Sequence, residues 1–230
     1  MNNIIDLPKL RGREHVFRDR SHAGEILADM LKPHCDPKSI VMAIPAGGIP
    51  VGSVVADKLK LSLDVAVVSK ITLPWNTEAG YGAVAFDGTV RLNQALLQRL
   101  GLNKEEIQKG INRTTNKVSS RVVGLRGSCP FPDLKGRGVI LVDDGVASGF
   151  TMKVAIEALQ RVGAERVTVA VPTAHTESAQ SVLKTADDVF CPNLRRGWQF
   201  AVASAYEKWS DVTEQEVIHI LESSNAFQMA

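Results

Sequence analysis

Two adjacent carboxylates, Asp143 and Asp144, follow an apolar run and precede a loop of small residues. The run, Val139–Val142, is typical of a buried strand, and the loop, Gly145–Gly149, leads into a helical stripe that begins near Thr151. The start of a helix binds phosphate well because its unpaired N–H groups face the ligand. Ionised carboxylates accept hydrogen bonds from vicinal sugar hydroxyls. The segment therefore predicts a binding site for a ribose 5-phosphate group.

Hydroxyl side chains in this loop strengthen the prediction. Ser148 and Thr151 could each donate a hydrogen bond to the same phosphate. The alternative is structural, with Asp144 or Ser148 acting only as the cap of the helix. The strand, both acids, the loop and the S-G-x-T spacing occur together, which favours the phosphate site. The predicted phosphate-binding residues are Gly145, Val146, Ala147, Ser148, Gly149, Phe150 and Thr151.

A second glycine-rich turn follows the first long apolar run. The segment Ala43–Gly52 contains Ala46, Gly47 and Gly48 between a predicted strand and a predicted helix, and such turns suit anions. It lacks the G-x-G-x-x-G spacing of a dinucleotide site, and a turn built for packing is the alternative. Lys70 ends another predicted strand, so we expect it at the edge where parallel sheets bind ligands. Its alternative is a surface lysine whose stem covers apolar neighbours.

The middle of the chain is basic. Between Arg91 and Arg137, ten Lys and Arg residues stand against three acids, which indicates either an anionic ligand or a solvated helix face. Long insertions that carry their own elements are usually lids or binding loops. The lid candidates are Glu78, Tyr81, Arg121 and Arg126, together with Arg113 and Lys117.

Val- and Ile-rich apolar runs alternate with helical stripes along most of the chain. This alternation predicts an α/β fold, with a parallel sheet covered by helices on both faces. The predicted strands are 40–44, 64–69, 139–142, 167–171 and 189–191. The predicted helices are 21–31, 50–60, 93–100, 104 to about 120, 151–161, 178–183 and 213–221.

A chain of 230 residues suits one large domain. We predict a single domain over 1–230, with a long inserted lid or loop region in its middle. The predicted limits are 38–71 and 138–192 for the core, 72–137 for the insertion, and 1–37 and 193–230 for the flanking segments.

The composition is close to that of an average globular protein. Hydrophobic residues make up 44% and charged residues 23%, which excludes disorder, and a net charge of +2 is too small to predict nucleic-acid binding. Cys35, Cys129 and Cys191 are widely spaced, which indicates neither a zinc site nor a disulfide framework. No apolar run approaches the roughly 18 residues of a membrane helix, so we expect a cytoplasmic protein without membrane contact.

The segment from Val139 to Met152 resembles the signature of type I phosphoribosyltransferases, in which two acids follow a strand and precede a T-G-x-T phosphate loop. Ser148 stands where that family usually has Thr, which keeps the hydroxyl. More broadly, the chain resembles a bacterial group of predicted phosphoribosyltransferases of unassigned substrate. The matching segments are Phe17–Arg20, Pro45–Val51, Ser69–Ile71, Gly82–Val84 and Arg126–Gly127, in addition to Val139–Met152.

This resemblance implies an enzyme of nucleotide metabolism that uses phosphoribosyl pyrophosphate (PRPP) and Mg²⁺. Asp143 and Asp144 would contact the ribose hydroxyls, and Ala147–Thr151 would hold the 5-phosphate. The 45–48 turn would be the pyrophosphate loop, with Lys70 beside Ala46, Gly47 and Gly48, and the basic insertion would be the mobile loop. The implied partners are PRPP and a nitrogenous acceptor, and the chain could form a homodimer. Mg²⁺ would be bound mainly through PRPP and not directly by the protein.

We also predict the sheet order 2-1-3-4-5 for the five strands, which would place the Pro45–Gly48 and Asp143–Thr151 loops side by side. Two positions depart from relatives. Many carry a basic residue at the position of Ala46, and those that use 6-oxopurines carry an Asp at the position of Ala147. The departure at Ala147 disfavours hypoxanthine and guanine as substrates.

Three other interpretations rest on individual residues. The alternative to an enzyme is a catalytically weak PRPP- or nucleotide-binding regulator, and the uncharged Ala46 is the feature that supports it. A response-regulator-like switch also has acids at strand ends, but it would not need the Ser148–Thr151 pattern. A lone His175 is more typical of a structural histidine than of a catalytic one, and neither a G-x-S-x-G elbow nor a P-loop motif is present.

Overall fold

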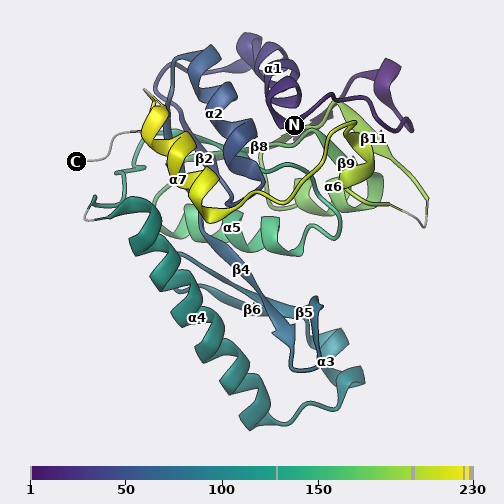
Figure 1. The fold of residues 1–230 in the computed structure, drawn as a ribbon, viewed down its shortest axis with the longest axis vertical. Helices are drawn as coiled ribbons and strands as arrows, with labels where there is room; N and C mark the ends of the chain where they lie inside the picture. The colour runs from purple at the N-terminus through teal and green to yellow at the C-terminus, as the bar shows by residue number, and fades with distance from the viewer. Residues whose placement is uncertain (1, 128, 198–199, 225, 228–230) are drawn as a thin grey trace.

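A six-stranded parallel sheet forms the centre of the molecule (Figure 1), in the order β3-β2-β7-β8-β10-β1. The structure, a computed structural model, describes residues 2–127, 129–197, 200–224 and 226–227, apart from the side chains of Thr77 and Glu78. The strands of this sheet are β1 (Asn3–Ile5), β2 (Ile40–Ala43), β3 (Ser62–Val65), β7 (Gly138–Val142), β8 (Arg166–Ala170) and β10 (Asp188–Phe190). The predicted order of five strands is confirmed, and β1 adds a sixth beside β10.

The prediction of a single second strand over 64–69 is wrong. The chain leaves the main sheet after Val65 and enters β4 (Val68–Leu73), which pairs antiparallel with β5 (Asn76–Ala85) in a separate sheet. The stretch from Val65 to Val68 is buried throughout, so its apolar run is continuous across the junction. Hydrophobic periodicity therefore carries no mark of the change from one sheet to the other. Lys70 consequently lies within β4 and not at the end of a main-sheet strand.

Every helix predicted from the sequence is present, with differences of at most two residues at the ends apart from the C-terminal end of α4. The helices are α1 (Arg20–Leu31), α2 (Gly48–Leu59), α3 (Gln94–Leu100), α4 (Lys104–Arg126), α5 (Phe150–Arg161), α6 (Thr176–Leu183) and α7 (Glu214–Ser223). The remaining strands are β6 (Val90–Leu92), paired with β5, and β9 (Thr173–His175) with β11 (Asn193–Arg195), and short 3₁₀ turns lie at Pro8–Leu10, Lys32–His34 and Ala203–Ala205.

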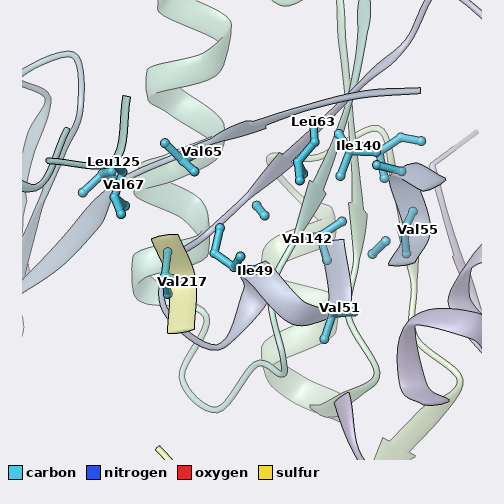
Figure 2. Packing of buried hydrophobic residues seen from close by; sticks show 14 of the residues in the cluster. Ile49, Val51, Val55, Leu63, Val65, Val67, Leu125, Ile140, Val142 and Val217 are labelled. Carbon is cyan, nitrogen blue, oxygen red and sulfur yellow. The ribbon is translucent and has the colours of Figure 1, made fainter. Parts of the chain in front are cut away.

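Both faces of the central sheet are buried, which explains why its strands are continuous apolar runs rather than alternating ones. Val41, Leu63 and Ile140 contribute to a core cluster that includes residues of α1, α2 and α7. Figure 2 shows part of this cluster, where side chains of α2 face those of β3 and β7. The alternate strand residues, such as Met42 and Leu141, belong to a second cluster with α5 and α6 on the opposite face.

The inserted region, which from here on includes the whole of β4 from Val68, extends away from the main sheet (Figure 1) and consists of β4, β5, β6, α3 and α4. Its long helix α4 begins with a capping box in which Asn103 and Glu106 each accept a hydrogen bond from the other's backbone N–H. Buried Thr114 and Val118 lie on the helix face that packs towards the insertion and the core. The helix continues to Arg126, about two turns beyond the predicted end, so it runs from the far end of the insertion back to the sheet. The domain limits given above stay a prediction.

Among the described residues, no helix is both long and apolar enough to cross a membrane.

Candidate functional site

Two loops meet at the carboxyl ends of the neighbouring strands β2 and β7. The Pro45–Gly48 loop follows β2, the loop that begins with Asp143 follows β7, and the two strands pair directly. A β-carbon at Gly47 would overlap the carboxylate of Asp144, and one at Gly48 would lie 2.8 Å from the carbonyl oxygen of Val142. Glycine is required here because the loops are in direct contact. The predicted side-by-side arrangement is therefore confirmed.

Asp143 is a half-buried carboxylate with little to neutralise it. Its Oδ1 accepts a hydrogen bond of 2.8 Å from the backbone N–H of Asp144. Burial raises the pKa of Asp143 well above the usual carboxyl value, and the charge of Asp144 raises it further. The positive charges of Arg20 and Lys70 oppose this shift in the pKa. Lys70 thus acts on the site electrostatically although it lies in β4.

Asp144 is held by an arginine to which the sequence alone assigns no role. Arg20 donates from Nε to Asp144 Oδ2 over 3.0 Å, and both side chains are largely buried. Arg20 also donates to the carbonyl oxygen of Ser210 over 2.9 Å and stacks on Trp209, with its guanidinium carbon 3.9 Å from the ring centroid. Burial raises the pKa of Asp144, and Arg20 opposes that rise.

The backbone of Asp144 is anchored from the C-terminal part of the chain. The Tyr206 hydroxyl donates to the carbonyl oxygen of Asp144 over 2.6 Å, and its ring packs on Phe17 with 5.6 Å between centroids. Burial raises the pKa of Tyr206 well above its usual value, so it remains a donor at neutral pH. The segment Phe17–Arg20, to which the resemblance assigns no role, therefore supports Asp144, directly through Arg20 and indirectly through the packing of Phe17 on Tyr206.

The Gly145–Thr151 loop is held by hydrogen bonds to Thr173 and Ser178, and part of it is exposed to solvent. Val146 N–H donates to the carbonyl of Thr173 over 2.9 Å, and the Ser178 hydroxyl donates to the carbonyl of Ala147 over 2.5 Å. Ala147 and Ser148 are exposed. Gly149 takes a φ of +73°, which favours glycine, and α5 begins at the next residue.

The capping alternative for this loop is not supported by the geometry. The N-cap of α5 is Gly149, and no side chain caps the helix there. The Ser148 hydroxyl accepts from the N–H of Phe150 over a long 3.4 Å, while Asp144 is engaged with Arg20. The first turn of α5, which includes Thr151, therefore has no side-chain cap and follows a loop in which Ala147 and Ser148 are exposed.

The lid candidates divide into two groups. Tyr81 is buried, and its hydroxyl packs against Gly110 of α4, so it contributes to the core of the insertion. Arg126 is also buried and forms an ion pair of 3.1 Å with Asp64. Neither residue occupies the lid position that the sequence suggested, because both are used to hold α4 in place. The side chain of Glu78 lies outside the described part of the chain.

Arg121 points towards the site. Its Nη1 lies 3.5 Å from the carbonyl oxygen of Pro45, so α4 brings a cation to the loop that follows β2. Arg113 and Lys117, earlier on the same helix, are exposed, and Arg113 contacts Thr72. His175 is half-buried, and its ring stands edge-on to Phe200, which suits a structural histidine.

The carboxylates of Asp143 and Asp144 are suitable ligands for a magnesium ion, but two side chains do not fill its six coordination positions. Within the described ranges there is no group of three or more His, Cys, Asp or Glu side chains that could hold a metal ion. Mg²⁺ prefers six oxygen ligands and retains waters. Burial and the charge of Asp144 raise the pKa of Asp143, so a nearby cation would favour the ionised form of this carboxylate. These residues therefore fit a Mg²⁺ that arrives with a substrate supplying most of its ligands.

Comparisons with known proteins agree on one family. A family model described as the phosphoribosyl transferase domain matches residues 87–208. Two Mycobacterium tuberculosis proteins, from strains CDC 1551 and H37Rv and each named "putative phosphoribosyl transferase", are 30% identical to this chain over 213 residues. These matches cover 91% of this chain and 47% of each relative, so the chain spans about half the length of these curated relatives.

A solved structure extends the similarity over nearly the whole chain. The crystal structure of TT1426 from Thermus thermophilus superposes with a TM-score of 0.74 at 34% sequence identity. The match covers 90% of this chain and 98% of TT1426. The α/β architecture with a central parallel sheet is thus shared over most of both chains.

Proposed function

The chain belongs to the phosphoribosyl transferase domain family, and from this premise we propose that it transfers ribose 5-phosphate from PRPP to a nitrogenous acceptor, with release of pyrophosphate. The observation that carries the proposal is the contact between two loops, one with adjacent carboxylates at a helix start and one rich in glycine. Such an edge of a parallel sheet is where α/β proteins bind ligands.

Each part of the site has a proposed role. Asp143 and Asp144 accept hydrogen bonds from the ribose hydroxyls, and the Gly145–Thr151 loop holds the 5-phosphate at the start of α5. The loop of Ala46, Gly47 and Gly48 holds pyrophosphate together with the Lys70 ammonium. The donors are the backbone N–H groups of Ala46 and Gly47, because that of Gly48 donates to the Ile44 carbonyl over 3.0 Å. The support is geometric for the loops and electrostatic for Lys70, whose charge acts on Asp143.

The protein would contribute positioning and electrostatic stabilisation. In the proposed reaction the bond between ribose C1 and the pyrophosphate oxygen breaks, and a nitrogen of the acceptor bonds to C1. Positive charge develops on the ribose, and the two nearby carboxylates stabilise it. Arg20 keeps Asp144 fixed, so this acid requires little reorganisation. A Mg²⁺ bound with PRPP would supply charge neutralisation on the leaving pyrophosphate.

The acceptor is proposed to be something other than a 6-oxopurine. Ala147 is exposed in the loop before α5 and has no group that can exchange a proton with a base. Members of the family that use hypoxanthine or guanine have an Asp at this position. Proton exchange with the acceptor would need another residue or the acceptor itself, which favours bases or amines with a free nitrogen lone pair.

The direct test combines the protein with Mg²⁺, PRPP and a panel of nitrogen bases and amines, and measures pyrophosphate release and acceptor consumption. We expect release with at least one acceptor and none above background with hypoxanthine or guanine. A matched reaction with the Asp143→Asn, Asp144→Asn variant is the control. Failure of the wild-type protein to bind PRPP would overturn the proposal.

A second candidate function is a PRPP-binding regulator without turnover, which the uncharged Ala46 in the pyrophosphate loop favours. The same experiment separates the two candidates. Calorimetric binding of PRPP without pyrophosphate release for any acceptor would identify the regulator.

A further inference from the structure

The loop proposed to bind pyrophosphate has no charged side chain of its own. Pro45, Ala46, Gly47 and Gly48 offer only backbone groups to a highly charged anion. Phosphate groups are normally held by backbone N–H groups together with Arg or Lys. A cation must therefore come from another part of the fold.

Arg121 reaches this loop from α4. Its Nη1 donates to the Pro45 carbonyl oxygen over a long 3.5 Å. Its Nε is buried and has no hydrogen-bond partner among the described residues. Buried N–H donors without an acceptor are costly and rare, so such a group often marks the place of a ligand that is not present.

Arg126, five residues further along α4, shows what a structural arginine looks like in this helix. Its Nε is likewise without a partner among the described residues, but its Nη2 lies 3.1 Å from Asp64 Oδ2 and 2.5 Å from the Pro130 carbonyl. Its guanidinium also stacks on Phe131 at 4.8 Å. Arg126 is therefore committed to an ion pair, whereas Arg121 has a weak contact with the loop itself.

The electrostatic surroundings of Arg121 point in the same direction. Burial lowers the pKa of Arg121, and the charge of Glu214 at the start of α7 raises it. Glu214 also approaches α4 at Gly124, with its Oε1 4.0 Å from a β-carbon built there. The guanidinium thus has one acidic neighbour, Glu214 of α7, and one contact of 3.5 Å with the turn after β2. An anion bound at that turn would further stabilise its positive charge.

We infer that Arg121 of the inserted region supplies a positive charge to the pyrophosphate subsite, in addition to that of Lys70. This inference rests on the proposed function. The Arg121 guanidinium exchanges the long contact with Pro45 for the oxygens of pyrophosphate bound to the backbone of Ala46 and Gly47. The inserted region and the α/β core therefore contribute to one site. Although Ala46 is uncharged, the loop still has a positive charge beside it, that of Arg121.

The experiment compares Arg121→Met with wild type by titration calorimetry, using Mg²⁺-pyrophosphate and inorganic phosphate as separate probes. Methionine retains the apolar stem and removes the partnerless donor. Arg121→Met should weaken pyrophosphate binding by roughly ten- to a hundredfold and change phosphate binding less than twofold. Its melting temperature should stay equal to or above that of wild type. Lys109→Met, which removes an exposed cation of the same helix, is the matched control and should bind both probes normally.

A rescue variant makes the test specific for charge. Placing an arginine on the loop, as Ala46→Arg in the Arg121→Met background, should recover most of the lost affinity for pyrophosphate. A purely structural arginine predicts the opposite set of results, with a lower melting temperature, equal losses for both probes and no rescue.

The outcomes separate this inference from the proposed function. If wild type binds pyrophosphate and Arg121→Met binds it equally well, the role of Arg121 is wrong and the phosphoribosyl transfer proposal stands. If wild type binds neither PRPP nor pyrophosphate, both are overturned.

Discussion

The two loops of the site obtain their polar groups in different ways. The loop after β7 carries its own acids, its own hydroxyl and the start of a helix within nine consecutive residues, Asp143–Thr151. The loop after β2 is uncharged, and the cations proposed for it, Lys70 of β4 and Arg121 of α4, come from other elements. One subsite is thus contiguous in the chain and the other is assembled by the fold. The contrast predicts that ribose and pyrophosphate binding can be damaged independently.

The largest expected effect comes from neutralising both acids. In Asp143→Asn with Asp144→Asn the loop backbone and the start of α5 are unchanged, so inorganic phosphate should bind nearly as in wild type. Asparagine keeps a neutral acceptor at each position, so the two charged hydrogen bonds to ribose, each of about 1.5–3 kcal/mol, are weakened by roughly half and not lost. PRPP binding should therefore weaken by about ten- to several-hundredfold, measured by calorimetry.

The control for this experiment is Asp29→Asn, an exposed acid of α1 that pairs with Lys58 at the surface. It should bind both ligands as wild type does. If the double variant also binds PRPP normally, the two acids are not ribose ligands and the contiguous subsite is misassigned.

The sequence predicts both loops and includes Lys70 and Arg121 among its candidates, but it does not predict the contacts that Arg20 and Arg121 make. The acids, the loop and the helix start share one local pattern of strand, small residues and helix. Arg20 acts on Asp144 from 124 residues away, and Arg121 reaches Pro45 across 76 residues. No periodicity or spacing in a single sequence encodes such pairs, because they depend on the packing of α1 and α4 against the loops.

The same reason explains the errors in the insertion. A run of buried valines hides the junction of β3 and β4, and basic residues on a long helix look alike whether they are exposed or buried. Arg121 and Arg126 are in similar sequence contexts, yet one faces the site and the other pairs with Asp64. Hydrophobic patterning located the strands of the main sheet because this sheet is buried on both faces.

A second prediction separates the two acids by their effect on stability. Asp144→Asn removes the charged partner of the largely buried Arg20 and should lower the free energy of unfolding by about 1.5–3 kcal/mol. Asp143→Asn removes a carboxylate whose burial is unfavourable and keeps an acceptor for the N–H of Asp144. It should leave the stability near neutral pH unchanged or higher. Urea unfolding measures both.

An equal loss of unfolding free energy in the two single variants would contradict this prediction, in which Asp144 is stabilised by Arg20 and Asp143 has no such ion pair. The variant Arg20→Met with Asp144→Asn is an additional check. It should be more stable than Asp144→Asn alone, because no buried guanidinium is left without its partner.

A third prediction concerns pH. The folded-state pKa of Asp143 is raised above its usual value of 3.8, so its contribution to stability is present below that value and is lost as pH rises through the folded-state pKa. Ribose binding needs the ionised carboxylate and therefore follows the opposite trend. PRPP affinity should increase by at most tenfold per pH unit up to the raised pKa of Asp143 and then level off.

Calorimetry with PRPP over a series of pH values, compared with Asp143→Asn, isolates this contribution because the ionisation of the PRPP phosphates is common to both proteins. The difference in affinity between wild type and variant should grow with pH. A difference that is constant at every pH would show that Asp143 does not titrate on binding.

The smallest expected effect tests whether the contiguous loop relies on its hydroxyl or on its backbone. Ser148 is exposed, and its hydroxyl makes one long contact with the N–H of Phe150, while the cap position of α5 is occupied by Gly149. Ser148→Ala should therefore leave the melting temperature unchanged. It should weaken inorganic phosphate binding by only about two- to fivefold, since one neutral donor is lost and the N–H groups remain. Ser148→Thr, which keeps the hydroxyl, should bind phosphate as wild type does. A marked drop in melting temperature with unchanged phosphate affinity would instead assign Ser148 to the helix cap and leave the loop's phosphate site to its backbone alone.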